Sequence, residues 1–296
     1  MRNVSSLEAI QRDYAPRGVK FYLIYKKLAH PGLDGYIDPF TLDERLTHIR
    51  EAKRTLGTSI PWLCDNMSND LKDKLGGVNN SEFVIDPAGK IVRMRDWSNA
   101  ETLRKDLTEL VGKVENPTRV ASLNLNIDRS RQSYPMNVVI PLDPPKSLTR
   151  IKSVAQPSDQ AFYAKLVASA EDVLLNEGDG RLLLNFQLDP VHRVHWNNLA
   201  APLEFEITAH GDGEILPKSA TSPHVEVDAD VDPREFVIYF CGMDREQPLE
   251  LTVRYFACSD SQGWCRPVTQ HYKVHFVADR EGRRGEFPFG GRRGQN

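Results

Sequence analysis

Long hydrophobic runs, a strong net charge and metal-chelating motifs are all absent from this 296-residue sequence. No apolar stretch approaches the roughly 20 residues of a membrane-spanning helix, which predicts a chain without a membrane span. The formal net charge of −3 removes the electrostatic basis for binding nucleic acid. No Cys-x-x-Cys pair occurs, and His192 and His195 would face opposite ways in a strand. The sequence therefore predicts no bound metal and no cofactor.

Cysteine is scarce, with four residues in the whole chain. Cys64 and Cys241 are isolated, whereas Cys258 and Cys265 lie close together in "YFACSDSQGWCRP". This pair fits a disulfide, and two unrelated reduced thiols are the alternative. Disulfides persist in oxidising compartments, yet the first residues lack the apolar core of a secretion signal. The location is thus unknown: cytoplasmic as written, and periplasmic or secreted if a signal lies upstream.

Helical and extended patterns alternate through residues 1–114. Helices are expected at 6–14, 41–57, 69–77 and 99–112, strands at 19–25 and 60–65, and a hairpin at 81–94. Thr41 and Glu44 fit a capping box, and Gly57 fits the helix end. This order predicts a mixed sheet covered by helices. It matches an α/β thioredoxin-like domain whose first strand and active-site turn are missing.

The pattern changes after residue 114. Residues 115–159 are extended and proline-rich, which indicates a connector. Residues 160–277 are predicted to form a domain of one helix and an all-β immunoglobulin-like sandwich. The helical pattern covers 159–180, and the sandwich is expected because the later segments alternate with period two. Residues 278–296 are rich in glycine and arginine and are predicted to be a disordered tail.

Three groups of residues in the first region form a family pattern. A buried strand leads into Ala29-His30-Pro31, followed by Asp34-Gly35 and Tyr36; a helix carries Arg45 and Ala52; and a later strand ends in Asp65-x-Met67-x-Asn69. With these motifs in order, residues 1–114 resemble the iodothyronine deiodinase family, thioredoxin-fold reductases that depend on selenium or sulfur.

The resemblance implies a reductive mechanism with a thiol reductant or redox protein as partner. In this family a selenolate or thiolate at the start of the first helix attacks the iodine of an aromatic substrate. His30 then takes the position of the histidine that binds substrate or moves a proton; the alternative is a histidine that caps a surface loop. Residues 1–63 contain no cysteine, so we expect no reductive deiodination by the chain as given.

The later strands carry a second resemblance. Residues 180–277 resemble the N-terminal immunoglobulin-like domain of the thiol–disulfide interchange protein family, with Cys258, Cys265 and Pro267 as the counterparts of its cysteine pair and proline. This resemblance implies a periplasmic relay of electrons through the pair, and a static bridge is the alternative. A third hypothesis for the whole chain is a non-catalytic binding or scaffold protein.

Overall fold

The computed structural model describes residues 4–28, 31, 35–76, 80–130, 133–143, 147–209 and 211–279. The chain divides into two compact units. The N-terminal unit comprises Met1–Ala29 and Thr41–Ser130, and the sheet unit comprises His30–Phe40 and Arg131–Asn296. The predicted domain limits at residues 114, 159 and 277 stay predictions. Most of the predicted tail, from residue 280 onward, lies outside the described residues.

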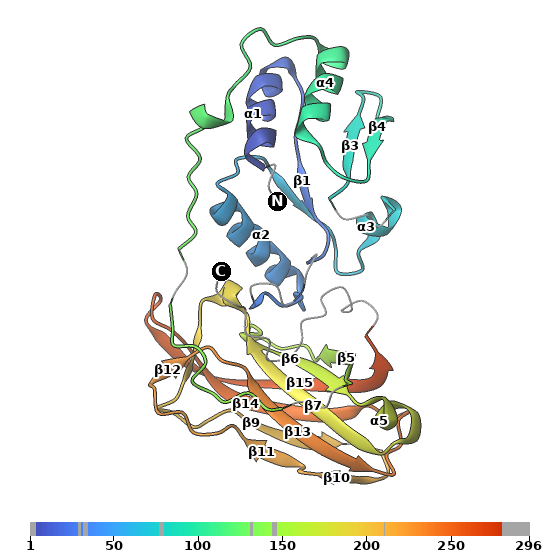
Figure 1. Cartoon of the computed structure of the whole chain (residues 1–296), viewed down its shortest axis with the longest axis vertical. Helices are drawn as coiled ribbons and strands as arrows, with labels where there is room; N and C mark the ends of the chain where they lie inside the picture. Colours follow the sequence, from blue (N-terminus) through green and yellow to red (C-terminus); the bar gives the residue numbers. More distant parts are fainter. Residues whose placement is uncertain are drawn as a thin grey trace. The chain divides into compact units, whose positions relative to one another are not determined.

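The elements of the N-terminal unit follow the predicted order (Figure 1). Each helix and strand expected between residues 6 and 112 is present, and several strands are shorter than expected. The helices are α1 (Val4–Tyr14), η1 (Ala15–Arg17), α2 (Leu42–Leu56), α3 (Asp70–Lys74), α4 (Ala100–Val111) and η3 (Val120–Ser122). The strands are β1 (Leu23–Tyr25), β2 (Trp62–Cys64), β3 (Glu82–Ile85) and β4 (Ile91–Arg95).

Helix α2 begins and ends where its capping residues predict. Thr41 Oγ1 accepts a hydrogen bond from the backbone N–H of Glu44 at 3.2 Å, which satisfies one free donor of the first turn. Gly57 closes the helix with a φ of +63°, a conformation that disfavours a side chain. A Cβ at this position would also lie 2.8 Å from Cγ1 of Ile127. Both predicted helix limits are confirmed.

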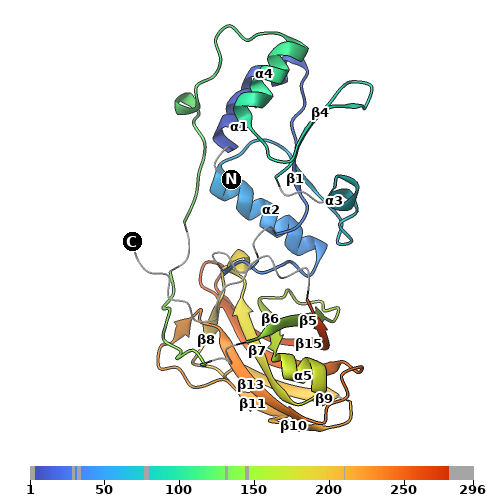
Figure 2. The same cartoon turned by 45° about the vertical axis from the view of Figure 1, so that its right-hand side comes forward.

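Helices α1 and α4 lie side by side and enclose the small core of this unit (Figures 1 and 2). Buried side chains of both helices meet there, namely Ile10, Tyr14, Leu103 and Leu107. The hydroxyl of Tyr14 lies 2.9 Å from Oγ1 of Thr108, which gives this buried phenol a polar partner.

The strands of the N-terminal unit form two small sheets. β1 and β2 are parallel, from Leu23 opposite Trp62 to Tyr25 opposite Cys64, and β3 and β4 form the predicted antiparallel hairpin. Within the described residues these pairs are separate, so the single mixed sheet is not observed. β1 and β2 are three residues long and bond only to each other. The thioredoxin-like fold stays a prediction.

The sheet unit contains a large antiparallel sheet with few helices. Its strand order is β10-β13-β7-β6-β5-β15-β14-β8-β12, with β9 pairing to β14 and β11 to β9. The strands are β5 (Thr149–Ala155), β6 (Ala164–Ala170), β7 (Gly180–Leu188), β8 (His195–Asn197), β9 (Glu204–Ala209), β10 (Glu214–Leu216), β11 (Ser219–Thr221), β12 (Ala229–Asp230), β13 (Arg234–Cys241), β14 (Leu249–Ser259) and β15 (Trp264–Ala278); its helical segments are α5 (Asp172–Glu177) and η4 (Pro190–His192).

This sheet curls over one hydrophobic core. The rings of Phe205 on β9 and Phe236 on β13 meet at 4.9 Å between centroids, although β7, β6, β5, β15 and β14 stand between the two strands. Tyr255 on β14 likewise accepts the backbone N–H of Ala164 on β6 at 3.0 Å. The antiparallel all-β character is therefore confirmed, and the two-sheet immunoglobulin-like arrangement stays a prediction.

The helix predicted over residues 159–180 is wrong for most of its length. Residues 164–170 form strand β6, and only Asp172–Glu177 are helical, with Gly178 as the C-cap. Alanine-rich sequence favours a helix locally. However, β6 pairs with β5 on one side and β7 on the other, and its small side chains are nearly all buried. Burial between two strands overrides the local propensity.

The predicted connector also contributes to the sheet. Strand β5 (Thr149–Ala155) falls within residues 115–159 and pairs with β15 and β6. Its proline-rich surroundings indicate a connector in the sequence. Its two pairing partners lie later in the chain, so the residues next to it give no sign that it belongs to the sheet. Among the described helices, none combines the length and the apolar character that crossing a membrane requires.

Candidate functional site

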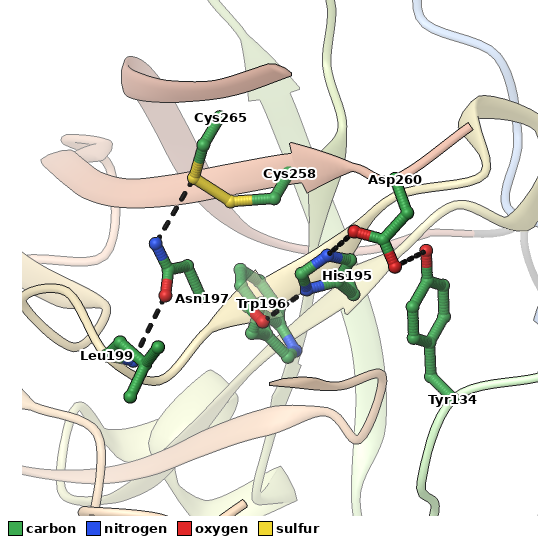
Figure 3. Close-up of a disulfide and its surroundings, with 8 residues drawn as sticks. All are labelled: Tyr134, His195, Trp196, Asn197, Leu199, Cys258, Asp260 and Cys265. Carbon is green, nitrogen blue, oxygen red and sulfur yellow. Dashed lines mark hydrogen bonds and ion pairs between the residues drawn. A yellow bond between two sulfur atoms is a disulfide. The ribbon is translucent and has the colours of Figure 1, made fainter. Parts of the chain in front are cut away.

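Strands β14 and β15 form a hairpin that places Cys258 directly opposite Cys265 (Figure 3). The two Cα atoms are 4.0 Å apart and the sulfur atoms form a disulfide, which confirms the pair expected from the sequence. The two cysteines differ in exposure, because Cys258 is only 6% exposed, whereas Cys265 is exposed. A thiol arriving from solvent can therefore reach one sulfur of the bond more easily than the other.

Strand β8 lies beside β14 and adds polar groups to the same face of the sheet. His195 is paired with Cys258, and Trp196 with Ala257. Because side chains alternate along a strand, His195 and Asn197 share the face of the disulfide, and Trp196 points to the other face. Trp196 is 3% exposed and belongs to the core.

Asn197 contacts the sulfur atom of Cys265, the exposed cysteine of the pair. Its Nδ2 donates a hydrogen bond to Cys265 Sγ at 3.2 Å, and its Oδ1 accepts the backbone N–H of Leu199 at 3.0 Å (Figure 3). Leu199 is 77% exposed and lies in the turn that follows. The amide thus joins the sulfur to the β8 turn.

A second polar group flanks the buried cysteine. His195 Nδ1 lies 2.7 Å from the carbonyl oxygen of Trp196 and its Nε2 lies 3.1 Å from Asp260 Oδ1. Tyr134 donates its hydroxyl to Asp260 Oδ2 at 3.1 Å. Its ring centroid lies 4.6 Å from that of the His195 imidazole, with the two planes tilted by 44°. Burial, followed by the charge of Asp260, raises the pKa of Tyr134. Tyr134 therefore stays a neutral donor at ordinary pH.

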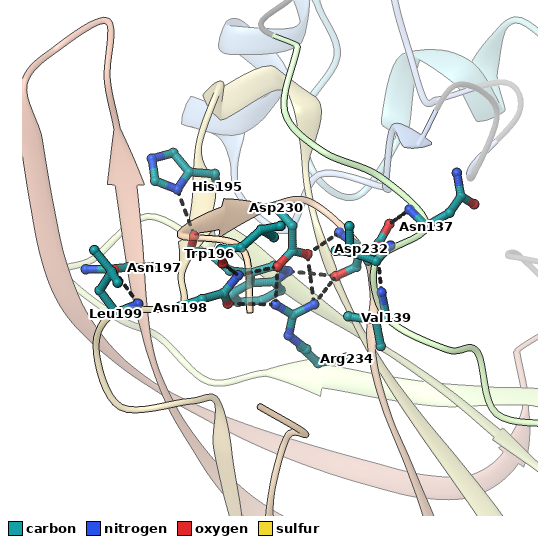
Figure 4. Close-up of polar contacts among 12 residues, drawn as sticks. Asn137, Val139, His195, Trp196, Asn197, Asn198, Leu199, Asp230, Asp232 and Arg234 are labelled. Atoms are coloured by element: carbon teal, nitrogen blue, oxygen red, sulfur yellow. Dashed lines mark hydrogen bonds and ion pairs between the residues drawn. The ribbon is translucent and has the colours of Figure 1, made fainter. Parts of the chain in front are cut away.

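A buried ion pair contacts strand β8 on the side of Trp196, the face opposite the disulfide (Figure 4). Arg234 is paired with Asp230 at 2.7 Å, lies 5.2 Å from the ring centroid of Trp196 and donates to Asn198. Burial alone would raise the pKa of Asp230, but the hydrogen bonds and charge of Arg234, with Asn198, outweigh it and lower the pKa. The indole of Trp196 donates to the carbonyl of Asp232 at 2.7 Å. These contacts fix the position of β8.

Residues 133–143, which we call the strap, are held by the same corner of the sheet. The carboxylate of Asp232 accepts the backbone N–H groups of Asn137, Val138 and Val139. Tyr134, which reaches Asp260, belongs to this strap. The corner of the sheet that carries Trp196 therefore also holds Tyr134, whose ring contacts that of His195.

In the N-terminal unit, Arg45 contacts residues of the predicted Asp65-x-Met67-x-Asn69 motif at the carboxyl end of β2. Its guanidinium donates to the carbonyl oxygens of Asp65 and Asn66 and to Asn69 Oδ1 at 2.8 Å. Arg45 is 4% exposed. Its Nε, also buried, has no hydrogen-bond partner among the described residues. Three of the motif residues are thus brought together, whereas His30 lies outside the described residues.

The two remaining cysteines are free thiols with raised pKa values. Burial raises the pKa of Cys64, with Asp65 adding to the effect and Arg45 opposing it. The charge of Asp179 is the largest cause of the raised pKa of the exposed Cys241. Neither position favours a thiolate. Among the described residues, no three His, Cys, Asp or Glu side chains gather as a metal site.

Sequence reasoning found the cysteine pair but missed Asn197, Asp260 and Tyr134. Asn197 and Tyr134 lie far from the pair along the chain, and no spacing rule connects them to it. Asp260 lies between the two cysteines, but nothing in the hairpin sequence indicates that it meets His195. No family model matches this chain, and neither the curated proteins nor the solved structures include a match to it.

Proposed function

We propose that the Cys258–Cys265 pair is redox-active and exchanges its disulfide with the thiols of a partner protein. One observation carries this proposal: Cys265 is exposed and its sulfur accepts a hydrogen bond from Asn197, whereas Cys258 is buried. Thiol–disulfide exchange requires access for the attacking thiolate at one sulfur only. A disulfide with one exposed and one buried cysteine therefore suits exchange through the exposed residue, Cys265.

The exchange balances with a protein dithiol as the reductant. A partner thiolate attacks Cys265 Sγ, an intermolecular disulfide forms, and the Cys258–Cys265 bond breaks with its electron pair leaving on Cys258. The second partner thiol then attacks the intermolecular disulfide, releases Cys265 and leaves the partner oxidised. Two electrons and two protons pass to the cysteine pair, which can reduce a second protein by the reverse steps.

The resemblance of residues 180–277 to the immunoglobulin-like domain of the thiol–disulfide interchange family supports this function. It rests on Cys258, Cys265 and Pro267, and it carries the proposal that the curled sheet is a variant of an immunoglobulin-like sandwich. Pro267 lies in β15, two residues after Cys265 and on the same face of the strand.

The test compares the two cysteines in proteins whose Cys64 and Cys241 are replaced by serine. The variant C258S keeps only Cys265 of the pair, and C265S keeps only Cys258. With oxidised glutathione at neutral pH, we expect mixed-disulfide formation to be about tenfold faster for C258S, because thiolate access controls the rate. Equal slow rates, together with a native disulfide that protein dithiols leave intact, would identify a static bridge.

A second candidate function concerns the N-terminal unit. We propose that it is a deiodinase-like, thioredoxin-fold domain, supported by the contacts of Arg45 with the residues of the Asp65-x-Met67-x-Asn69 motif. Residues 1–63 contain no cysteine and Cys64 does not favour a thiolate. The residues of this unit therefore offer no thiolate of their own for reduction, and what we propose for them is the binding of an aryl iodide.

Titration with an iodinated phenol tests this second candidate. We expect saturable quenching of Trp62 fluorescence and no iodide release with a dithiol reductant. Absence of binding would favour the non-catalytic scaffold hypothesis for this unit. Iodide release that survives replacement of all four cysteines would contradict the predicted requirement for a thiolate.

A further inference from the structure

We propose that Asn197 is a catalytic residue of the exchange, whose side-chain amide stabilises the thiolate of Cys265. The inference rests on the proposed redox function of the pair. Asn197 Nδ2 lies 3.2 Å from Cys265 Sγ, within hydrogen-bond reach of a sulfur acceptor (Figure 3). A donor on a sulfur favours its anionic form over the thiol.

The second contact of Asn197 fixes which end of the amide faces the sulfur. Its Oδ1 accepts the backbone N–H of Leu199 at 3.0 Å. A backbone N–H can only donate, so the amide oxygen must face Leu199 and the NH₂ group must face Cys265. The donor is therefore directed at the sulfur before any reaction begins.

His195 is the residue that a search for an activating base would choose first. However, its Nδ1 faces the carbonyl oxygen of Trp196 and its Nε2 faces the carboxylate of Asp260. Both ring nitrogens therefore have acceptor partners other than a sulfur atom. Within the described residues, this leaves Asn197 as the polar side chain that donates a hydrogen bond to a sulfur of the pair.

Asn197 is held in place by the residues on either side of it. Trp196 is fixed by its indole hydrogen bond to Asp232 and by the guanidinium of Arg234, and Asn198 binds both Asp230 and Arg234 (Figure 4). A donor on a rigid support does not have to be reorganised when charge develops on its acceptor. The amide is thus preorganised for a thiolate.

This donor assigns different roles to the two cysteines once the pair is reduced. The Cys265 thiolate attacks the disulfide of an oxidised partner, an intermolecular disulfide forms, and the partner's second sulfur leaves as a thiolate. Cys258 then attacks Cys265 Sγ, which restores the Cys258–Cys265 bond and releases the partner as a dithiol. Two electrons and two protons leave the cysteine pair, and the partner disulfide receives them.

The experiment uses the full chain with Cys64, Cys241 and Cys258 replaced by serine, so that Cys265 is the only thiol. The rate of alkylation by iodoacetamide is measured against pH. We expect N197A to move the midpoint of this profile upward by about one pH unit, because a charge-assisted hydrogen bond is lost. We expect N197D to move it further, because a carboxylate repels the thiolate.

The aspartate variant separates a chemical role from a structural one. The carboxylate introduced by N197D would still accept the N–H of Leu199, so the turn is kept while the donor to Cys265 is lost and a negative charge is added. The variant S261D adds the same charge in the hairpin turn without replacing the donor. Unchanged midpoints in N197A and N197D, or equal shifts in N197D and S261D, would overturn the proposal.

Reduction of the intact pair by a protein dithiol is measured separately on the otherwise unmodified chain. A pair that resists the dithiol contradicts the redox function, whatever the midpoint shift shows. A pair that is reduced normally, with unchanged midpoints in the Asn197 variants, contradicts only the role of Asn197. The two failures are thus distinguishable.

Discussion

The two units of this protein are stabilised in different ways. In the N-terminal unit, helices with local caps are tied together by single carboxylates such as Glu8, which accepts hydrogen bonds from Thr58, Ser59 and Ile60. In the sheet unit, ion pairs such as Arg234 with Asp230 lie inside the fold, at 2% and 0% side-chain exposure. Local capping makes an element predictable from its own sequence, whereas buried pairs depend on distant parts of the chain.

Among the variants that test this comparison, removal of Arg234 should cause the largest loss of stability. R234A leaves the Asp230 carboxylate buried without its counter-charge, which should lower the free energy of unfolding of the sheet unit by about 3 to 5 kcal/mol. Urea unfolding followed by tryptophan fluorescence in a W62F/W97F background reports on this unit. The control R254A removes an exposed pair with Glu206 and should cost less than about 0.5 kcal/mol. Similar losses in both variants would contradict the role of burial.

Glu8 offers the corresponding test in the N-terminal unit. It is 4% exposed, and E8A removes the acceptor that Thr58, Ser59 and Ile60 share, at a cost of roughly 2 to 3 kcal/mol. Unfolding followed by circular dichroism at 222 nm reports on the helices of this unit. E101A, which removes an 81% exposed side chain, is the matched control. A loss of stability in the sheet unit alone would refute the assignment.

Opening the disulfide should have a somewhat smaller effect. The bridge joins residues separated by 7 positions, and the chain-entropy relation for so short a loop gives about 2.5 kcal/mol. We expect C258S/C265S to destabilise the sheet unit by this order while leaving the N-terminal transition unchanged. Loss of the folded sheet unit in this double variant would show that the bridge is indispensable for folding and would weigh against a redox function.

The smallest expected effect is a change in pH dependence at Glu235. Burial raises the pKa of this carboxyl, with hydrogen bonds from Leu142 and Asn185 opposing the shift. The folded state then binds more protons than the unfolded state, so stability falls as pH rises from the unfolded pKa through the raised one. E235Q should flatten this fall, which begins near the ordinary glutamate pKa of 4.5 and continues above it; urea unfolding at several pH values measures the change. If the free energy of unfolding of E235Q falls with pH as steeply as that of the unmodified chain, Glu235 is not the cause of this pH dependence.

The site was only partly predictable from the sequence. Cys258 and Cys265 were paired because a short loop separates two strand-like segments, and such a hairpin places opposed residues within reach of a bridge. Tyr134 and Asn197 had no such signal, since both arrive from other parts of the chain. The position of His30 is not described, so its role stays a prediction.

The sequence by itself determined the helix caps at Thr41 and Gly57, the order of elements in the N-terminal unit and the cysteine hairpin, because each depends on residues close together in the chain. Only the tertiary structure decided that residues 164–170 form a strand, because their alanines gain more from burial between β5 and β7 than from local helix propensity. It likewise decided that Asn197 meets Cys265, 68 residues later. Strand pairing across such distances depends on the whole sheet, and no local pattern records it.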